Sequence, residues 1–367
     1  MIGSTIAELA YYRGRVALHA LLRGLAVGPG DEVATQAFTC VAVPEGIMAT
    51  GATPVWIDVA RDSYTMDPVD LEPKLTPKTR AIVIQHTFGI PARMDELLAV
   101  ARRHSIPIIE DCCHTHGSIY GDAIVGSFGV GAFYSFEWGK PLVVGVGGSA
   151  IVNDSALRAT VRAAYAEYQP PSLLRVLRVQ AQYMMFDILY RPSRYWRLRS
   201  AFRALARFGV AESNYHAPGS GLSPEFHQRM AGSLRRRLVR KAASHREDVA
   251  HAQELAGIYS SQIRGKDVRQ PEIPPCGRAI FARYPLRVPN KAELLEHARA
   301  SNIELADWYT SPVHPLSKVE WKHVAYSAGS CHRAEQLATE VVSLPTHTRA
   351  TSKTADRAVA FFEKEYS

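Results

Sequence analysis

Two ionisable side chains follow apolar segments of the kind that form buried strands, and both could take part in catalysis. Lys140 lies four residues beyond the segment GAFYSF, and Asp111 closes the segment IPIIED. Ligands of parallel α/β sheets bind beyond the carboxyl ends of the strands, so an amine and a carboxylate at these positions could meet at one ligand. A lysine amine can act there as a nucleophile or as a base. Taken alone, Lys140 would be interpreted as a solvated loop residue and Asp111 as a helix cap.

A third candidate feature is the start of a helix near the N-terminus. A predicted helix begins at Gly14, Arg15 and Val16, continues through ALHALLRGL and ends before the helix-breaking segment GPGDE. The N–H groups at a helix start, together with an arginine, suit a phosphate group. Ser135, which lies five residues before Lys140, could donate its hydroxyl group to the same phosphate. Most helices begin without binding an anion, so these residues indicate a phosphate site only together with Lys140 and Asp111.

The elements that would position these side chains alternate in type between Asp31 and Asp154. Five short segments rich in apolar and β-branched residues predict strands buried on both faces, and an amphipathic segment at 94–104 predicts a crossover helix. Strands that alternate with helices form a mostly parallel sheet, so we expect an α/β fold with helices flanking that sheet. The predicted strands are residues 51–59, 81–87, 106–111, 131–136 and 148–154.

An arginine-rich insertion follows this region. Two segments at 172–191 and 195–210 place arginines among apolar residues at helical spacing, and Pro192 separates them. Residues 170–210 contain eight arginines against one acid, Asp187. Two interpretations stay open. In the first, the helices pack against the rest of the protein or a partner subunit, and their arginines face solvent. In the second, the helices bind an anionic lipid surface or a lipid-linked substrate, and their apolar side chains are inserted.

The C-terminal part has an α+β pattern, because an apolar strand at 281–288 is followed by helical segments. We predict a large domain over residues 1–258, which includes the insertion, and a small domain over residues 259–367. Helices are expected at residues 157–168, 227–259, 291–301, 335–344 and 352–366.

Composition and charge exclude several classes of protein. With 367 residues, 47% of them apolar, the chain can bury a sizeable core and is neither fibrous nor disordered. Five cysteines are too few for a disulfide scaffold. We find no leader pattern and no apolar run of about 18 residues, so we expect a cytoplasmic protein. If the insertion binds lipid, the protein would be peripheral at the inner membrane face. The net charge of +8 comes almost entirely from the insertion, which argues against a nucleic-acid partner. The 14 histidines show no paired ligand spacing, so we predict no metal site.

Several of these segments match a known family in order and spacing. They are GRVALHALLRGLAVGPGDEV, QAFTCVAV, GATPVWIDV, LTPKTRAIVIQHTFGIPARMD, IIEDCCHTHGSIYG, GSFGVGAFYSFEWGKPLVVGVGGSAIVND and VVSLPTH. From Gly14 to about Asp154 the chain resembles the DegT/StrS family of sugar aminotransferases, fold-type I enzymes that depend on pyridoxal 5'-phosphate. The family carries a longer segment before this helix. The resemblance is looser over residues 155–330, where Arg229 and Met230 stand for the end of a family motif.

The resemblance implies roles for individual residues. Lys140 would be the catalytic residue that attaches the cofactor covalently, and Asp111 would pair with the ring nitrogen so that the ring withdraws electrons. His114 stands where the family usually has glutamine near the ring. Cys40 stands where an aromatic residue often stacks on the ring, although a small core residue explains it equally well. The implied phosphate ligands are Gly14, Arg15, Val16 and Ser135.

The resemblance also implies the reaction, which is transfer of an amino group, usually from glutamate, to a keto sugar linked to a nucleotide, in polysaccharide or natural-product biosynthesis. It further implies a homodimer. Two alternatives stay open. The insertion would suit a lipid-linked or membrane-associated carbonyl substrate, and the charge of +8 would suit a non-catalytic regulatory or nucleic-acid-binding protein. Lys140 disfavours sugar dehydration, because family members with that activity carry histidine in its place.

Overall fold

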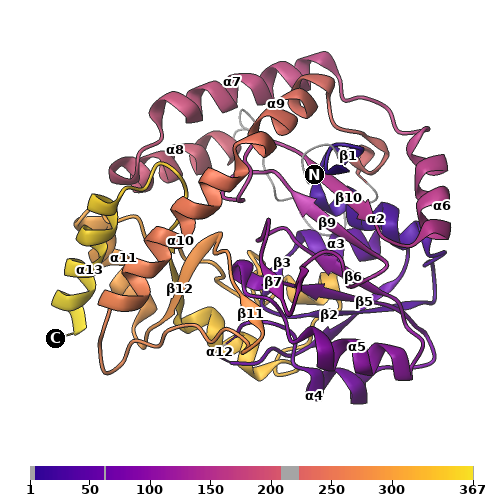
Figure 1. The fold of residues 1–367 in the computed structure, drawn as a ribbon, viewed down its shortest axis with the longest axis horizontal. Helices are drawn as coiled ribbons and strands as arrows, with labels where there is room; N and C mark the ends of the chain where they lie inside the picture. The colour runs from indigo at the N-terminus through magenta and orange to yellow at the C-terminus, as the bar shows by residue number, and fades with distance from the viewer. Residues whose placement is uncertain (1–4, 62, 208–222, 367) are drawn as a thin grey trace.

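A seven-stranded sheet forms the centre of the molecule, of which the computed structural model describes residues 5–61, 63–207 and 223–366 (Figure 1). In sheet order the strands are β1 (Leu9–Tyr11), β10 (Gly148–Val152), β9 (Gly131–Ser135), β6 (Ile108–Asp111), β5 (Thr79–Gln85), β2 (Glu32–Gln36) and β4 (Thr53–Ile57). Neighbours are parallel from β9 to β4, and β10 runs antiparallel to β9 and to β1. The expected α/β fold with a mostly parallel sheet is therefore confirmed.

Helices cover both faces of this sheet and bury its strands. Side chains alternate along a strand, so that Val83 of β5 packs among the helices on one face and Ile84 among those on the other. This two-sided burial explains why the strands are continuous apolar segments in the sequence. One face carries α2 (Gly14–Gly24), α3 (Ala42–Met48) and α6 (Ser155–Tyr165), and the other carries α4 (Pro68–Leu71) and α5 (Met94–Arg103).

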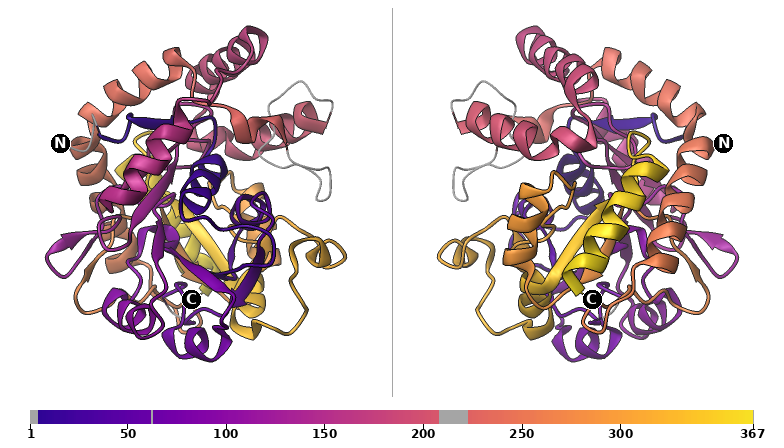
Figure 2. Two further views of the ribbon diagram at one scale, coloured as in Figure 1. Left: turned by 90° about the vertical axis from the view of Figure 1, so that its right-hand side faces the viewer. Right: turned by 90° about the vertical axis from the view of Figure 1, so that its left-hand side faces the viewer.

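The C-terminal part is built on a two-stranded antiparallel sheet with helices packed around it (Figure 2). Its strands are β12 (Arg283–Arg287) and β14 (Val341–Pro345). The prediction of a helix over 335–344 is wrong from Val341 onward, because Val341 and Val342 are β-branched, fully buried and paired with β12. The helices of this part are α10 (His245–Gln262), α11 (Lys291–Ala300), α12 (His332–Glu340) and α13 (Ser352–Tyr366).

Two helices replace the single one expected at 227–259. α9 (Gly232–Ala243) ends where Ser244 leaves helical geometry with φ −89° and ψ 4°, and α10 starts directly afterwards. Tyr259 of α10 is fully buried in the hydrophobic cluster that α10 shares with the C-terminal sheet and helices. Because α10 runs through residue 258, the division of the chain into domains at that residue stays a prediction.

Small sheets tie distant parts of the chain together. β3 (Thr39–Cys40) pairs in parallel with β13 (Val313–His314), which brings a C-terminal loop against the N-terminal half. β7 (Ile119–Tyr120) pairs antiparallel with both β8 (Ala123–Ile124) and β11 (Gly277–Arg278).

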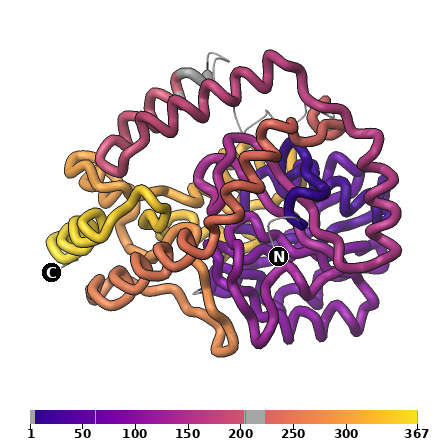
Figure 3. The backbone as a smooth tube through the Cα atoms, turned by 45° about the horizontal axis from the view of Figure 1, so that its top comes forward, coloured from indigo at the N-terminus to yellow at the C-terminus, as the bar shows by residue number. Residues whose placement is uncertain are grey.

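The arginine-rich insertion forms the two expected helices, which lie along one side of the molecule (Figures 1 and 3). They are α7 (Leu173–Leu189) and α8 (Tyr195–Arg207), joined by the short 3-10 helix η3 (Pro192–Arg194). The indole N–H of Trp196 donates to the carbonyl oxygen of Ile303 at 2.7 Å, which fastens α8 to the C-terminal part. Among the residues that the structure describes, no helix is both long and apolar enough to cross a membrane.

Candidate active site

The carboxyl ends of β6 and β9 and the first turn of α2 surround one cavity of about 190 Å³. Val16 does not reach it, because its side chain is fully buried in the core behind α2 and its N–H donates to the carbonyl oxygen of Arg13 at 3.2 Å. Lys140 and Asp111 both line the cavity, so the structure brings together an amine and a carboxylate that lie 29 residues apart in the sequence. The other predicted cofactor residues all line the cavity and are Gly14, Arg15, Cys40, Asp111, His114, Ser135 and Lys140.

Lys140 sits in a tight turn that follows β9. Its backbone N–H donates to the carbonyl oxygen of Glu137 at 3.2 Å, and Gly139 before it has φ +78°, a conformation that favours glycine. A Cβ atom on Gly139 would lie 2.9 Å from the ring of Trp308, and Lys140 Nζ lies 5.5 Å from the centre of that ring. Trp308 thus covers the amine. Sequence reasoning missed Trp308, because it comes from a C-terminal loop with no pattern that links it to Lys140.

Asp111 is a buried carboxyl group at the end of β6, with 3% of its surface exposed. Its Oδ1 accepts a hydrogen bond from the backbone N–H of Cys113 at 2.9 Å. Burial raises the pKa of Asp111, while that hydrogen bond and the positive charge of Lys140 act in the opposite direction. A carboxylate in such low-dielectric surroundings attracts a cationic ligand atom more strongly than an exposed one does.

His114 is a neutral histidine packed flat against an indole. Its ring lies 5.6 Å from that of Trp308 at an interplanar angle of 14°. Burial and the charge of Lys140 hold the pKa of His114 well below its usual range. Nδ1 accepts the backbone N–H of Phe88 at 3.1 Å, so Nε2 carries the proton and donates to the hydroxyl oxygen of Tyr309 at 3.2 Å. His114 therefore presents a flat, uncharged ring to the cavity.

The first turn of α2 approaches β9 closely enough to favour glycine at its start. A Cβ atom on Gly14 would lie 3.1 Å from Cβ of Ser135, 3.3 Å from the carbonyl oxygen of Tyr134 and 3.5 Å from Sγ of Cys113. Gly14 thus lets the helix start pack directly against Ser135, and both residues line the cavity. Backbone N–H groups of a first helical turn suit a phosphate.

Arg15 is held by acids that the sequence did not link to it. Its guanidinium pairs with Glu45, and its Nε lies 3.6 Å from Glu225. Arg13 beside it pairs with Glu137 at 2.8 Å and with Glu225 at 3.0 Å. Burial raises the pKa of Glu45 to about 7, although Arg15 acts in the opposite direction. This buried network fixes the helix start. Arg15 also lines the cavity, and the phosphate contact expected for it stays a prediction.

Cys40 forms part of the cavity wall on β3. It is paired with His314 of β13 and is half-buried. Burial raises the pKa of the thiol, so it stays protonated near neutral pH.

This set of groups fits pyridoxal phosphate. The cavity offers an amine for covalent attachment, a buried carboxylate for the ring nitrogen and, beside Ser135, a helix start for the phosphate. Lys140 and Asp111 line the same cavity, as the attachment and the charge pairing both require.

Comparisons with known proteins identify the family. The sequence model of the DegT/DnrJ/EryC1/StrS aminotransferase family matches residues 7–185 and 195–363. The chain belongs to this family. It is 31% identical over 334 residues to dTDP-3-amino-3,4,6-trideoxy-alpha-D-glucose transaminase of Streptomyces venezuelae, a match that covers 90% of this chain and 76% of that protein. It is 29% identical over 334 residues to UDP-N-acetyl-3-dehydro-alpha-D-glucosamine 3-aminotransferase of Acidithiobacillus ferrooxidans, with 90% and 77% covered.

The fold agrees with this assignment. The crystal structure of the S. venezuelae protein DesV superimposes with a TM-score of 0.75 at 26% sequence identity, over 98% of this chain and 84% of that one. The fold-type I architecture is thereby confirmed, and the chain is an aminotransferase. Family membership favours an enzyme over the non-catalytic interpretation.

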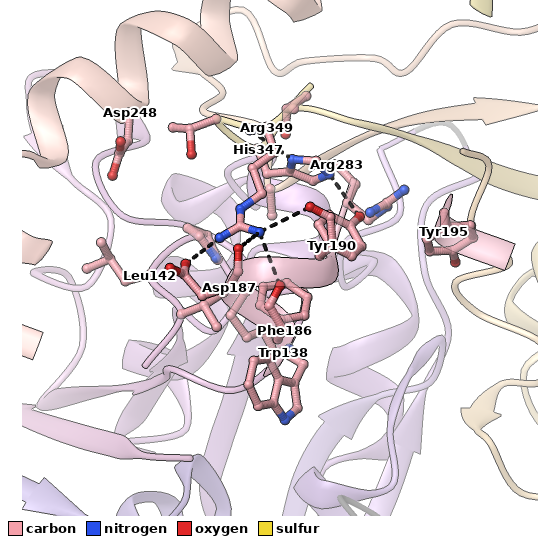
Figure 4. A pocket seen from close by; sticks show the side chains of 18 of the residues that line it. Trp138, Leu142, Phe186, Asp187, Tyr190, Tyr195, Asp248, Arg283, His347 and Arg349 are labelled. Atoms are coloured by element: carbon pink, nitrogen blue, oxygen red, sulfur yellow. Dashed lines mark hydrogen bonds and ion pairs between the residues drawn. The ribbon is translucent and has the colours of Figure 1, made fainter. Parts of the chain in front are cut away.

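This DegT/DnrJ/EryC1/StrS aminotransferase carries a second, larger cavity beside the first. It measures about 690 Å³, within the size range of small-molecule sites, and shares Trp138, Lys140 and Trp308 with the smaller one. Figure 4 shows Trp138 and Phe186 next to each other in its wall, with ring centres 4.7 Å apart. Its apolar wall includes Leu142, Met185, Phe186, Leu198, Val249 and Phe281.

Three arginines in the wall of this larger cavity are each paired with an acid. Their positive charge is neutralised by those carboxylates, so the wall around them is less cationic than its composition indicates. The pairs are Arg349 with Asp187, Arg283 with Glu304 at 3.1 Å, and Arg199 with Asp307.

A cluster of His86, Glu110 and Cys112 behind β6 has the donor types of a metal site. Glu110 and His86 are already hydrogen-bonded within the protein. Three backbone N–H groups donate to Glu110 at 2.6–2.8 Å, and His86 Nε2 lies 3.1 Å from that carboxylate. The backbone N–H of Ala92 donates to His86 Nδ1 at 3.1 Å. We interpret the cluster as a support for the end of β6, next to Asp111.

The remnant of the family motif lies at the edge of the central sheet. Arg229 forms a bridge with Tyr11 of β1, and the N–H of Met230 donates to the carbonyl oxygen of Ala10 at 2.8 Å. The segment before it supplies Glu225 to the network around the helix start.

Proposed function

We propose that this chain is a pyridoxal phosphate-dependent aminotransferase that moves an amino group from glutamate to a keto sugar. The observation that carries the proposal is that Lys140 and Asp111 line one cavity with the first turn of α2. An amine, a buried carboxylate and an anion-binding helix start are the three groups that this cofactor needs.

The surroundings of each group favour a distinct role. When bound, pyridoxal phosphate supplies an electron-withdrawing ring that stabilises negative charge on a substrate carbon. Asp111 would keep the ring nitrogen protonated, since a buried carboxylate favours a nearby cation. Lys140 would attach the cofactor and, once a substrate amine has released it, carry a proton at Nζ. Trp308 and His114 pack over this region and limit the access of water.

Absorption spectroscopy tests the assignment directly. Wild-type protein supplied with pyridoxal phosphate should show a visible band from the attached cofactor, and Lys140→Ala should lack it. Lys78→Ala is the matched control, because Lys78 is exposed and precedes β5 at the amino end of the sheet, whereas the cavity lies at the carboxyl ends. Borohydride reduction followed by peptide mass spectrometry should locate the label on Lys140. A label on another lysine, or a visible band that persists in Lys140→Ala, would overturn the proposal.

A nucleotide-linked keto sugar is the first candidate for the acceptor. The two relatives described above are named for dTDP-linked and UDP-linked amino sugars. The expected half-reactions are bleaching of the visible band by glutamate and its return with a suitable member of a panel of nucleotide-linked keto sugars.

A keto sugar that carries an apolar group is a second candidate, favoured by the larger cavity beside Lys140 and its apolar wall. Leu198→Trp would fill part of that cavity. It should raise the KM severalfold for an acceptor with an apolar group and leave the KM of a nucleotide-linked acceptor unchanged. Equal KM values for wild type and variant with both acceptors would exclude a role of the cavity in acceptor binding.

We further propose that the protein is a homodimer, which the family resemblance supports. Size-exclusion chromatography with light scattering should give twice the mass of the chain. A monomer with full cofactor absorption would contradict this part of the proposal.

A further inference from the structure

The outer side of α7 is apolar, although it faces solvent. At 100° per residue, seven positions follow one another around about 120° of the helix, and all seven are exposed. The exposed fraction reaches 72% at Leu173, 79% at Leu174 and 70% at Ile188. We call this surface the outer face of α7. In order around the helix it consists of Leu173, Met184, Leu177, Ile188, Ala181, Leu174 and Met185.

The inner side of α7 is already used for packing. Val179 is buried, and the rings of Tyr183 and Phe186 pack against Trp138, with centres 6.1 and 4.7 Å away. The helix is therefore apolar on both sides, whereas a helix at a protein surface normally turns a polar side outward. Of the fourteen exposed large apolar side chains in the described chain, seven lie on α7. Such a concentration marks an interaction surface.

Positive charge borders the outer face. Arg178 follows Met185 around the helix, and Arg194 and Arg197 after α7 are exposed as well. The one acid between residues 170 and 210, Asp187, is paired with Arg349. On the neighbouring helix α9, Arg235, Arg236 and Arg240 are exposed.

We propose that the outer face of α7 docks on an anionic lipid bilayer. An exposed apolar helix face bordered by arginines matches a membrane surface, whose acyl chains accept the apolar residues and whose phosphates attract the arginines. A second copy of the chain is a poorer occupant, because a twofold contact would place the same arginines of both copies near one another. With 17 residues, α7 offers a contact about 25 Å long. The contact is peripheral, with side chains inserted about 5–10 Å deep.

The docked face would lie beside the entrance of the larger cavity. Met185 of the outer face also lines that cavity. Leu189, one turn later on α7, lines the cavity as well. An acceptor held at the membrane would then lie next to the cavity that Lys140 also lines. The docking itself does not depend on the proposed function, since none of the seven residues of the outer face lines the smaller cavity around Lys140.

Sedimentation with vesicles tests the docking. Full-length protein should pellet with vesicles of phosphatidylcholine and phosphatidylglycerol, pellet much less with phosphatidylcholine alone, and be released in part at 1 M salt, where the screening length falls to about 3 Å. Lys140→Ala should pellet like wild type, which separates docking from cofactor chemistry.

Two sets of variants separate the apolar and the charged contributions. Leu174→Glu with Ile188→Glu should weaken binding at least about tenfold, and Val319→Glu is the control, because Val319 is 77% exposed and belongs to a C-terminal loop. Replacing Arg178, Arg194 and Arg197 together by glutamine should weaken binding to anionic vesicles about a hundredfold. Replacing the exposed Arg102, Lys318 and Lys353 by glutamine removes the same charge elsewhere and should have a much smaller effect.

Each outcome decides for or against the proposal. Loss of vesicle binding in the α7 variants, with the cofactor band retained, supports it. Wild-type protein that stays in the supernatant with both kinds of vesicle overturns it, as does equal pelleting of the Val319→Glu control and the α7 variants. If Leu174→Glu with Ile188→Glu instead turns a dimer into a monomer and wild type binds no vesicles, the outer face is an interface between two copies.

Discussion

Glu304 connects the insertion to the C-terminal sheet and offers a quantitative test of that connection. Its buried carboxylate accepts a hydrogen bond from the hydroxyl group of Tyr190 at 2.7 Å, and it lies 3.1 Å from Arg283 Nη1 and 3.2 Å from His347 Nε2. Burial by itself raises the pKa of Glu304. The charges of His347 and Arg283 and the hydrogen bonds outweigh burial and lower the pKa to about 2.

The stabilisation follows from this pKa. A glutamate in the unfolded chain titrates near pH 4.3, so folding favours the ionised form by about 3 kcal/mol at 1.36 kcal/mol per pH unit. For a depressed pKa this stabilisation is present above about pH 4.3 and is lost as the pH falls toward 2. We expect Glu304→Gln to lower the free energy of unfolding by about 3 kcal/mol at pH 7 and by about half as much at pH 3.

Denaturant unfolding of wild type and Glu304→Gln at both pH values measures the difference. Glu340→Gln is the matched control, because Glu340 at the end of α12 pairs with Arg287 of β12 at 3.2 Å but both side chains are partly exposed. It should cost less than about 1 kcal/mol. If Glu304→Gln lost the same free energy at pH 7 and at pH 3, packing rather than charge would explain the loss, and the reasoning would be refuted.

Two smaller predictions concern the helix start and the thiols. Gly14→Ala should weaken the binding of pyridoxal phosphate in a fluorescence titration, because the new Cβ would lie 3.1 Å from Cβ of Ser135, whereas Gly28→Ala should not, since its nearest neighbour is 4.0 Å away. Equal affinities of the two variants would show that the helix start does not touch the cofactor. A thiol reagent should modify about one cysteine rapidly in the native protein, because Cys276 is exposed and the other four are buried or half-buried. Rapid labelling that survives in Cys276→Ser would contradict the burial of the remaining thiols.

Much of the candidate active site could be predicted because its parts are local in sequence. Continuous apolar segments identify strands buried on two faces, and the ends of such strands in a parallel sheet meet at one edge. Lys140 and Asp111 are placed by that rule alone. Trp308 and Tyr309 could not be predicted, because a loop about 170 residues later reaches the cavity through the pairing of β13 with β3.

The remaining differences come from tertiary contacts that override local patterns. The sequence did not show that Arg15, which lines the cavity, also pairs with Glu45 and lies near Glu225, which is 210 residues away in sequence. Val341 continues a helical pattern, yet pairing with β12 makes it a strand. The arginines of α7 indicated a polar side toward solvent, whereas its aromatic residues pack inward and a second apolar side is left outside.

The arginine–glutamate network at the helix start constrains how the sequence can evolve. Loss of Arg15 alone would leave Glu45 and Glu225 with one guanidinium fewer in a buried place, and an uncompensated buried charge costs several kcal/mol. The cost of replacing Arg15 by an uncharged residue therefore depends on whether Glu45 and Glu225 have already been replaced. Substitutions at these three positions are coupled, and their order decides which intermediate sequences stay stable.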